Sequence, residues 1–337
     1  MKKETKKKLN YLILVFVTII VLYFSLKDNF NEITHTILTI NIWYLLIAFV
    51  FIFLFWLFRS YPMYTFSKKI NKDFKYKDAF ILTLRTQFFN AVTPFATGGQ
   101  PYQIYYLKNK GIDYASSTSI VLENFIVYQI ALVLLGLIAL FTNKALHLFK
   151  NVYILQRLIA LGFIINTLVI VVMFIIAFSK KMNKKIIGFA LKLLNKLHIV
   201  KDIEKKEKEW NESINKFHES ASILLRDKKS FILNIFSNFL ALTLLYLIPL
   251  IVLYSMGDFT SVNPLKSIVT SAYVMLIGSF VPIPGATGGL EYGFVSFYGN
   301  FISGSTLQAL MLVWRFITYY FGMIMGAIVL NIHEVKK

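Results

Sequence analysis

Five ionisable side chains lie inside long apolar runs of the sequence, where a charge is costly to bury. They are Arg59, Arg85, Glu123, Glu291 and Arg315. Charged residues in such runs pair with one another, bind a polar group of a ligand or relay protons. Arg59 lies near the end of its run, where a long side chain can snorkel, so we read it as structural. The other four are candidates for a polar site.

Two short motifs rich in Pro and Gly interrupt the apolar sequence. Residues 94–102 read PFATGGQPY and residues 284–292 read PGATGGLEY, and both fit Pro-x-Ala-Thr-Gly-Gly-x-x-Tyr. A helix that begins after such a break presents free N–H groups and a positive dipole end, which suit phosphate. A second interpretation remains open, because small residues also let helices pack closely. The two interpretations are compatible.

The two motifs differ in charge at one position. Glu291 stands in the second motif where Pro101 stands in the first. On one interpretation Glu291 pairs with Arg315, or Glu123 with an arginine, and the pairs fix packing. On the other, the first motif and an arginine bind a phosphate, and Glu291 or Glu123 binds an amine. The sequence does not decide between them.

The candidate site residues follow from the motifs and the buried charges. They are Thr97, Gly98, Gly99, Gln100, Tyr102, Thr287, Gly288, Gly289, Glu291, Tyr292, Arg85, Glu123 and Arg315. Further polar lining is expected from Gln87, Asn90, Gln103, Asn124 and Gln129. We predict no catalytic residues, no metal site and no cofactor, because the five histidines are scattered and no HExxH, GxSxG or Walker sequence occurs.

The elements that position these residues are membrane-spanning helices. The chain of 337 residues is 57% hydrophobic and 16% charged, with a net charge of +19, whereas soluble domains are about 25% charged. Six apolar runs approach or exceed the length of about 20 residues that spans a bilayer: 9–26, 42–66, 115–141, 154–178, 231–256 and 305–331. We therefore predict an all-α polytopic membrane protein with six full spans. The first run lacks a cleavage site and is expected to be a retained anchor.

Two shorter apolar stretches, 78–92 and 266–281, each run into one of the motifs. We predict that each forms a re-entrant hairpin, over 78–112 and 266–303. With both termini in the cytoplasm, the predicted inside segments hold 28 of the 36 Lys and Arg residues, as the positive-inside rule expects. A single crossing by 78–112 would instead place the basic segment 179–230 outside.

The two halves of the chain repeat one another at an offset of 190 residues. This offset carries 42–66 onto 232–256 and 115–141 onto 305–331. Each half has three spans, an odd number, so the second half must be inverted relative to the first. The predicted units are a basic tail (1–8), a first inverted repeat (9–141), a second (154–331) and a cytoplasmic tail (332–337).

Residues 179–230 form the one sizeable polar insertion. Ile203, Trp210, Ile214, Phe217, Ala221 and Leu224 recur at three-, four- and seven-residue steps, which predicts an amphipathic helix on the cytoplasmic membrane face. The segment 186–197 mixes lysines with apolar residues and is expected to lie in the interface. Its basic residues suit anionic lipid, and nucleic acid is not expected as a partner.

The paired P-x-A-T-G-G motifs, and above all the run VPIPGATGGLEYGF (281–294), resemble the transmembrane flippase-like domain of lysylphosphatidylglycerol synthases, the multiple peptide resistance factor family. The resemblance covers roughly residues 10–331. It implies movement of aminoacylated phosphatidylglycerol or a related phospholipid or polyprenyl lipid between leaflets. In the full-length synthases a further domain makes the lipid as a phosphatidylglycerol lysyltransferase; the chain ends at NIHEVKK, so we expect the stand-alone form without it.

We therefore expect a lipid translocase in a bacterial or archaeal cell membrane. A separate lipid synthase or glycosyltransferase is an expected partner, and a homodimer is left open. Three alternatives share many of these features: a lipid-modifying membrane enzyme, a protein that only assists one, and a secondary transporter for a small solute.

Overall fold

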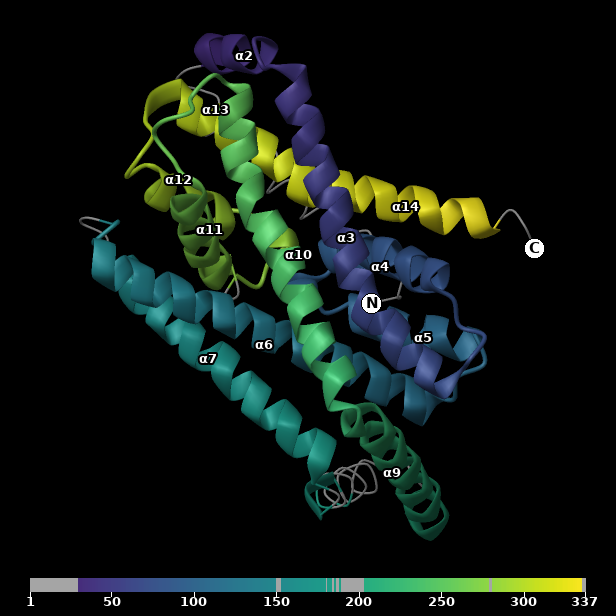
Figure 1. The fold of residues 1–337 in the computed structure, drawn as a ribbon. Helices are drawn as coiled ribbons and strands as arrows, with labels where there is room; N and C mark the ends of the chain where they lie inside the picture. Colours follow the sequence, from purple (N-terminus) through teal and green to yellow (C-terminus); the bar gives the residue numbers. More distant parts are fainter. Residues whose placement is uncertain are drawn as a thin grey trace.

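The computed structural model describes residues 30–149, 153–179, 181–183, 185, 188, 203–278 and 281–334. Every regular element in these residues is helical (Figure 1). The predicted first span (9–26) and almost all of the predicted interfacial segment (186–197) lie outside the described residues.

Five helices are long and apolar enough to cross a membrane within the part of the chain that the structure describes. They are α3 (Ile42–Ile70), α6 (Tyr114–Leu146), α7 (Tyr153–Phe178), α10 (Lys228–Ser255), and the continuous pair α13 (Gly304–Arg315) and α14 (Phe321–Glu334). A π-helical segment, η3 (Phe316–Tyr320), joins the last pair. These helices confirm five of the six predicted runs as candidate spans.

Each Pro/Gly motif separates two helices that are too short to span a bilayer. The first pair is α4 (Tyr76–Ala91) and α5 (Gly99–Asn109), with the 3-10 turn η1 (Pro94–Ala96) between them. The second pair is α11 (Pro264–Gly278) and α12 (Gly289–Tyr298), with η2 (Pro284–Ala286) between them. The breaks follow from the sequence, because Pro removes a backbone donor and the turns need positive φ. Phe95 and Gly285 have φ of 53° and 65°.

The helices α3 and α10 lie side by side through the middle of the molecule and run antiparallel (Figure 1). The side chain of Thr65 donates to Asn234 at 2.8 Å, and Arg59 donates to Asn238 at 2.8 Å. The residue numbers of the bonded partners therefore fall along α10 as they rise along α3. These two helices correspond at the 190-residue offset, so equivalent helices point in opposite directions.

A proline in α3 creates a further contact between these two helices. Pro62 cannot donate to the carbonyl of Phe58, four residues earlier. The hydroxyl of Ser237 on α10 donates to that carbonyl at 2.7 Å. A side chain of a neighbouring helix thus satisfies the freed backbone group, as a proline in an apolar environment requires.

The hairpins pack across the two halves of the molecule. Helix α4 contacts α14, and its counterpart α11 contacts α6. Each motif hairpin is therefore held by the closing helix of the opposite half. The larger apolar core joins residues of both halves, including Trp56, Leu135, Leu242 and Phe294.

Two further helices lie at the ends of the bundle (Figure 1). Helix α2 (Phe30–Leu38) contacts α13, and α9 (Ile203–Arg226) contacts α6. Ile214 and Ala221 of α9 are buried, and Phe217 is partly buried, which confirms the predicted apolar face at these positions.

After α9, the backbone N–H of Ser230 and the Lys69 ammonium hold the pKa of the Asp227 carboxyl below its usual value.

Candidate functional site

The two motif turns meet each other in the centre of the molecule. The turn η1 contacts η2, and η2 also contacts α4. The phenol of Tyr319, in the π-helical segment, donates to the carbonyl of Ala91 at 3.0 Å. Since Ala91 ends α4, this bond ties the closing helix of the second half to the first motif.

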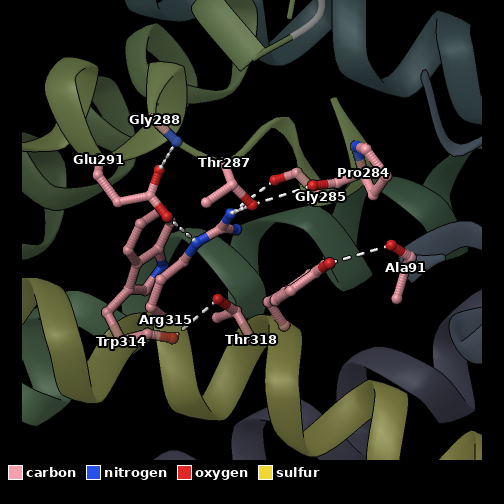
Figure 2. A network of polar contacts seen from close by, with 10 residues as sticks. Ala91, Pro284, Gly285, Thr287, Gly288, Glu291, Trp314, Arg315 and Thr318 are labelled. Carbon is pink, nitrogen blue, oxygen red and sulfur yellow. Dashed lines mark hydrogen bonds and ion pairs between the residues drawn. The ribbon is translucent and has the colours of Figure 1, made fainter. Parts of the chain in front are cut away.

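Arg315 and Glu291 form a buried ion pair inside the second motif (Figure 2). The Nε of Arg315 donates to Oε1 of Glu291 at 2.6 Å, and the two residues are 5% and 6% exposed. The Nη2 of Arg315 also donates to the carbonyl of Gly285 at 2.6 Å and to the hydroxyl of Thr287 at 3.4 Å. Arg315 therefore fixes the irregular backbone of the second turn.

The second oxygen of Glu291 caps the helix that follows the turn. The backbone N–H of Gly288 donates to Glu291 Oε2 at 2.7 Å. Both carboxylate oxygens thus have partners in the protein. Of the two interpretations that the sequence left open, the pairing of Glu291 with Arg315 is the arrangement present in the structure.

A polar cavity of about 600 Å³ lies beside the first motif. Helices α3, α4, α5 and α6 and the turn η1 supply most of its wall. Its polar lining comprises Arg59, Thr83, Thr86, Gln87, Asn90, Thr97, Gln100, Gln103, Thr118, Asn124 and Tyr128. Within the described part of the chain, no carboxylate lines it. The volume is within the range of small-molecule sites.

A second cavity of about 230 Å³ lies between the two motif turns. Arg315, Tyr319 and Gly285 line it from the second half. It shares five wall residues with the larger cavity: Phe55, Gln87, Asn90, Ala96 and Tyr128. The two cavities are therefore neighbours that extend from the first motif to the buried ion pair.

Arg59 points into the protein, in contrast to the structural, snorkelling role expected from the sequence. Besides the bond to Asn238, its guanidinium carbon lies 4.0 Å from the centre of the Tyr128 ring. No carboxylate lies within 4.0 Å of it among the described residues. Its position near a helix end suggested snorkelling, and only the orientation of α3 against α10 shows that it lines the cavity.

The structure brings some of the predicted site residues to these cavities and not others. Thr97 and Gln100 line the larger cavity and Arg315 the smaller one. The ten remaining predicted residues line neither: Gly98, Gly99, Tyr102, Thr287, Gly288, Gly289, Glu291, Tyr292, Arg85 and Glu123. Of the further polar residues, Gln87, Asn90, Gln103 and Asn124 line a cavity, whereas Gln129 donates to Asn166 at 3.1 Å.

Arg85 and Glu123 have local partners away from the cavities. Arg85 donates to the phenol of Tyr102 and to the carbonyl of Val329, each at 3.2 Å. Glu123 is fully buried and accepts from Ser119 at 3.0 Å. Tyr292 of the second motif is 64% exposed. Among the described residues, no group of three His, Asp or Glu side chains is placed to hold a metal ion.

Comparison with known proteins assigns the chain to a family. The family described as the lysylphosphatidylglycerol synthase transmembrane region matches residues 11–326. The chain belongs to this family. It is also similar to a UPF0104 membrane protein of Archaeoglobus fulgidus, with 26% identity over 330 residues that cover 96% of this chain and 97% of that protein. The resemblance inferred from the motifs is confirmed, and with it a multi-pass membrane protein.

Proposed function

We propose that this protein moves a phospholipid, or a related lipid with a polar headgroup, between the two leaflets of the membrane. The observation that carries the proposal is the polar cavity beside the first motif. Eleven polar side chains of the described residues line it, among them Arg59, and two of its wall helices, α3 and α6, are long and apolar enough to cross a membrane. A wet cavity at membrane depth gives a headgroup a polar path through the hydrocarbon.

Re-entrant hairpins fit the lengths of the motif helices. Helices α5 and α12 have 11 and 10 residues, so each reaches only about 16 Å, roughly half of the hydrocarbon core. The antiparallel pairing of α3 with α10 and the exchanged packing of α4 and α11 support two inverted repeats. In such architectures the substrate site lies at the interface of the repeats, near the midplane.

The charge distribution gives the proposed orientation. Both termini lie in the cytoplasm, with α9 and the rest of the basic insertion on the same side. The exposed lysines of α9, Lys208 and Lys216, face anionic lipid in this orientation. A separate enzyme that makes or consumes the lipid is the proposed partner. The movement is downhill, coupled to an ion gradient, or driven by lipid synthesis on one side of the membrane.

The transport proposal predicts a change of lipid sidedness in proteoliposomes. Wild-type protein should move a fluorescent phosphatidylglycerol from the outer to the inner leaflet faster than protein-free vesicles do, with the lipid chemically unchanged. A quencher added outside measures sidedness, and mass spectrometry measures lipid identity. Chemical conversion of the lipid in the presence of the protein would indicate an enzyme instead. Uptake of a water-soluble solute without lipid movement would indicate a secondary transporter.

A further inference from the structure

The larger cavity has a charged wall whose sign bears on the headgroup that it could bind. Arg59 is its one charged lining residue, and no carboxylate lines either cavity in the described part of the chain. Arg315 lines the smaller cavity, but Glu291 already balances its charge. The uncompensated charge of the joined cavities is therefore positive.

The guanidinium of Arg59 is positioned but not saturated. One of its nitrogens donates to the neutral amide of Asn238, and its plane lies over Tyr128. Arginine has five N–H donors in a planar fork. The others have no partner among the described residues. A charge held this way inside a protein requires a counter-ion, and the planar fork matches the oxygens of a phosphate.

The rest of the wall provides neutral donors at the same cavity. Gln87, Asn90, Gln100 and Asn124 carry amide N–H groups, and Thr83 and Thr86 carry hydroxyls. These groups hydrogen-bond phosphate oxygens and headgroup hydroxyls without adding charge. None of them balances an ammonium group.

The acidic residues suggested as amine ligands do not serve this cavity. Both oxygens of Glu291 have protein partners, Arg315 and the N–H of Gly288. Glu123 is fully buried against Ser119 and lines neither cavity. An aminoacyl headgroup would thus bring a second positive charge beside Arg59 with no carboxylate to receive it.

We infer that the larger cavity is an anion site in which Arg59 binds the phosphate of a headgroup that carries no amine, such as that of phosphatidylglycerol. This inference rests on the proposed function, since it names the headgroup class of the lipid to be moved. It assigns Asn238 and Tyr128 as positioning residues for the guanidinium.

Lipid binding to the detergent-purified protein, measured by native mass spectrometry, tests the inference. The probes are phosphatidylglycerol, lysyl-phosphatidylglycerol and a neutral diglucosyl-diacylglycerol. We expect the wild type to prefer phosphatidylglycerol over both. Arg59→Gln should lower the affinity for phosphatidylglycerol by about tenfold or more, which is the usual contribution of a charge-assisted hydrogen bond. The affinity for the glycolipid should not change.

Two further variants separate the site from general charge and from folding. Arg157→Gln removes the same charge from an exposed position on α7, away from the basic insertion, and should leave binding unchanged. Gln87→Glu keeps the shape of the side chain and places a carboxylate in the wall of both cavities. This variant should bind phosphatidylglycerol more weakly and lysyl-phosphatidylglycerol more tightly than the wild type does. Preference for the lysyl lipid in the wild type, or equal binding by wild type and Arg59→Gln, overturns the inference.

Soluble phosphates distinguish a lipid site from a site for a free anion. Glycerol phosphate should compete with phosphatidylglycerol only weakly, because it lacks the acyl chains. Arg59-dependent binding of glycerol phosphate with no lipid binding would retain the anion site and overturn the lipid function. Lipid transport that is insensitive to Arg59→Gln would retain the function and overturn the site.

Discussion

Replacing Arg315 with methionine is expected to lower the free energy of unfolding by about 3–5 kcal/mol, which is the usual cost of removing one partner from a buried ion pair. Glu291 is only 6% exposed, and the substitution leaves its carboxylate without a counter-ion. The substitution also removes the donor to the carbonyl of Gly285 in the second motif turn. Thermal unfolding of the purified protein in detergent measures the loss.

Arg85, an arginine on α4, provides the matched control. Arg85→Met removes bonds to the phenol of Tyr102 and the carbonyl of Val329, but no carboxylate. Its expected cost is about 1–2 kcal/mol, because no buried charge is left unpaired. An equal loss in both variants would mean that the ion pair has no special role.

The double variant Glu291→Met/Arg315→Met tests whether the cost comes from the orphaned charge. Buried pairs replaced by apolar side chains of similar volume are often neutral or stabilising. The double variant should therefore recover most of the stability lost in Arg315→Met. If it is less stable than both single variants, the two side chains contribute independently. A stable double variant that no longer moves lipid would separate a role in transport from a role in folding.

The sequence predicted the helices better than it predicted the site. Long apolar runs specify membrane helices because the bilayer requires length and hydropathy, and both are local properties. The two Pro/Gly motifs likewise predicted the two breaks, since Pro and Gly act on their own backbone. Five candidate spans and both breaks are present in the described residues where the patterns indicated.

The direction of each polar side chain depends on packing between distant segments. Glu291 and Arg315 are 24 residues apart on different helices, and spacing alone left Glu123 as an equal alternative. The sequence shows that Arg59 lies near the end of an apolar run, which suggested snorkelling. It does not show the partner of Arg59, because Asn238 is 179 residues away. Depth in the membrane follows from position along a helix, whereas the face that meets a cavity follows from the neighbouring helices.

The packing of α14 on α4 depends on a single missing side chain at Gly326. A Cβ built there would lie 2.7 Å from the carbonyl oxygen of Leu84 and 2.8 Å from the amide nitrogen of Phe88. Both atoms belong to the backbone of α4, which cannot rotate away. Gly326→Ala is expected to destabilise the protein by about 1–3 kcal/mol, as overpacking does. Gly326→Leu should prevent close packing and reduce the yield of folded protein.

Gly322, one turn earlier on the same helix, provides a control of the opposite sign. Its added Cβ would meet the nearest atoms, of Trp56 and Gln87, at 3.6–3.8 Å, which is ordinary contact. Gly322→Ala should therefore be neutral or stabilise by up to about 1 kcal/mol, because alanine favours the helix. Thermal unfolding of both variants in the same detergent gives the comparison.

Gly326 should also affect function, because two hydrogen bonds tie α14 and the segment before it to the first hairpin. Arg85 on α4 donates to the carbonyl of Val329 on α14, and Tyr319 just before α14 donates to Ala91 at the first motif. A displaced α14 would stretch both bonds and alter the wall that the two cavities share. Gly326→Ala should thus slow lipid movement more than Gly322→Ala does. If the alanine at 322 were the more harmful of the two, the close approach of α14 to α4 would not be what holds the first hairpin in place.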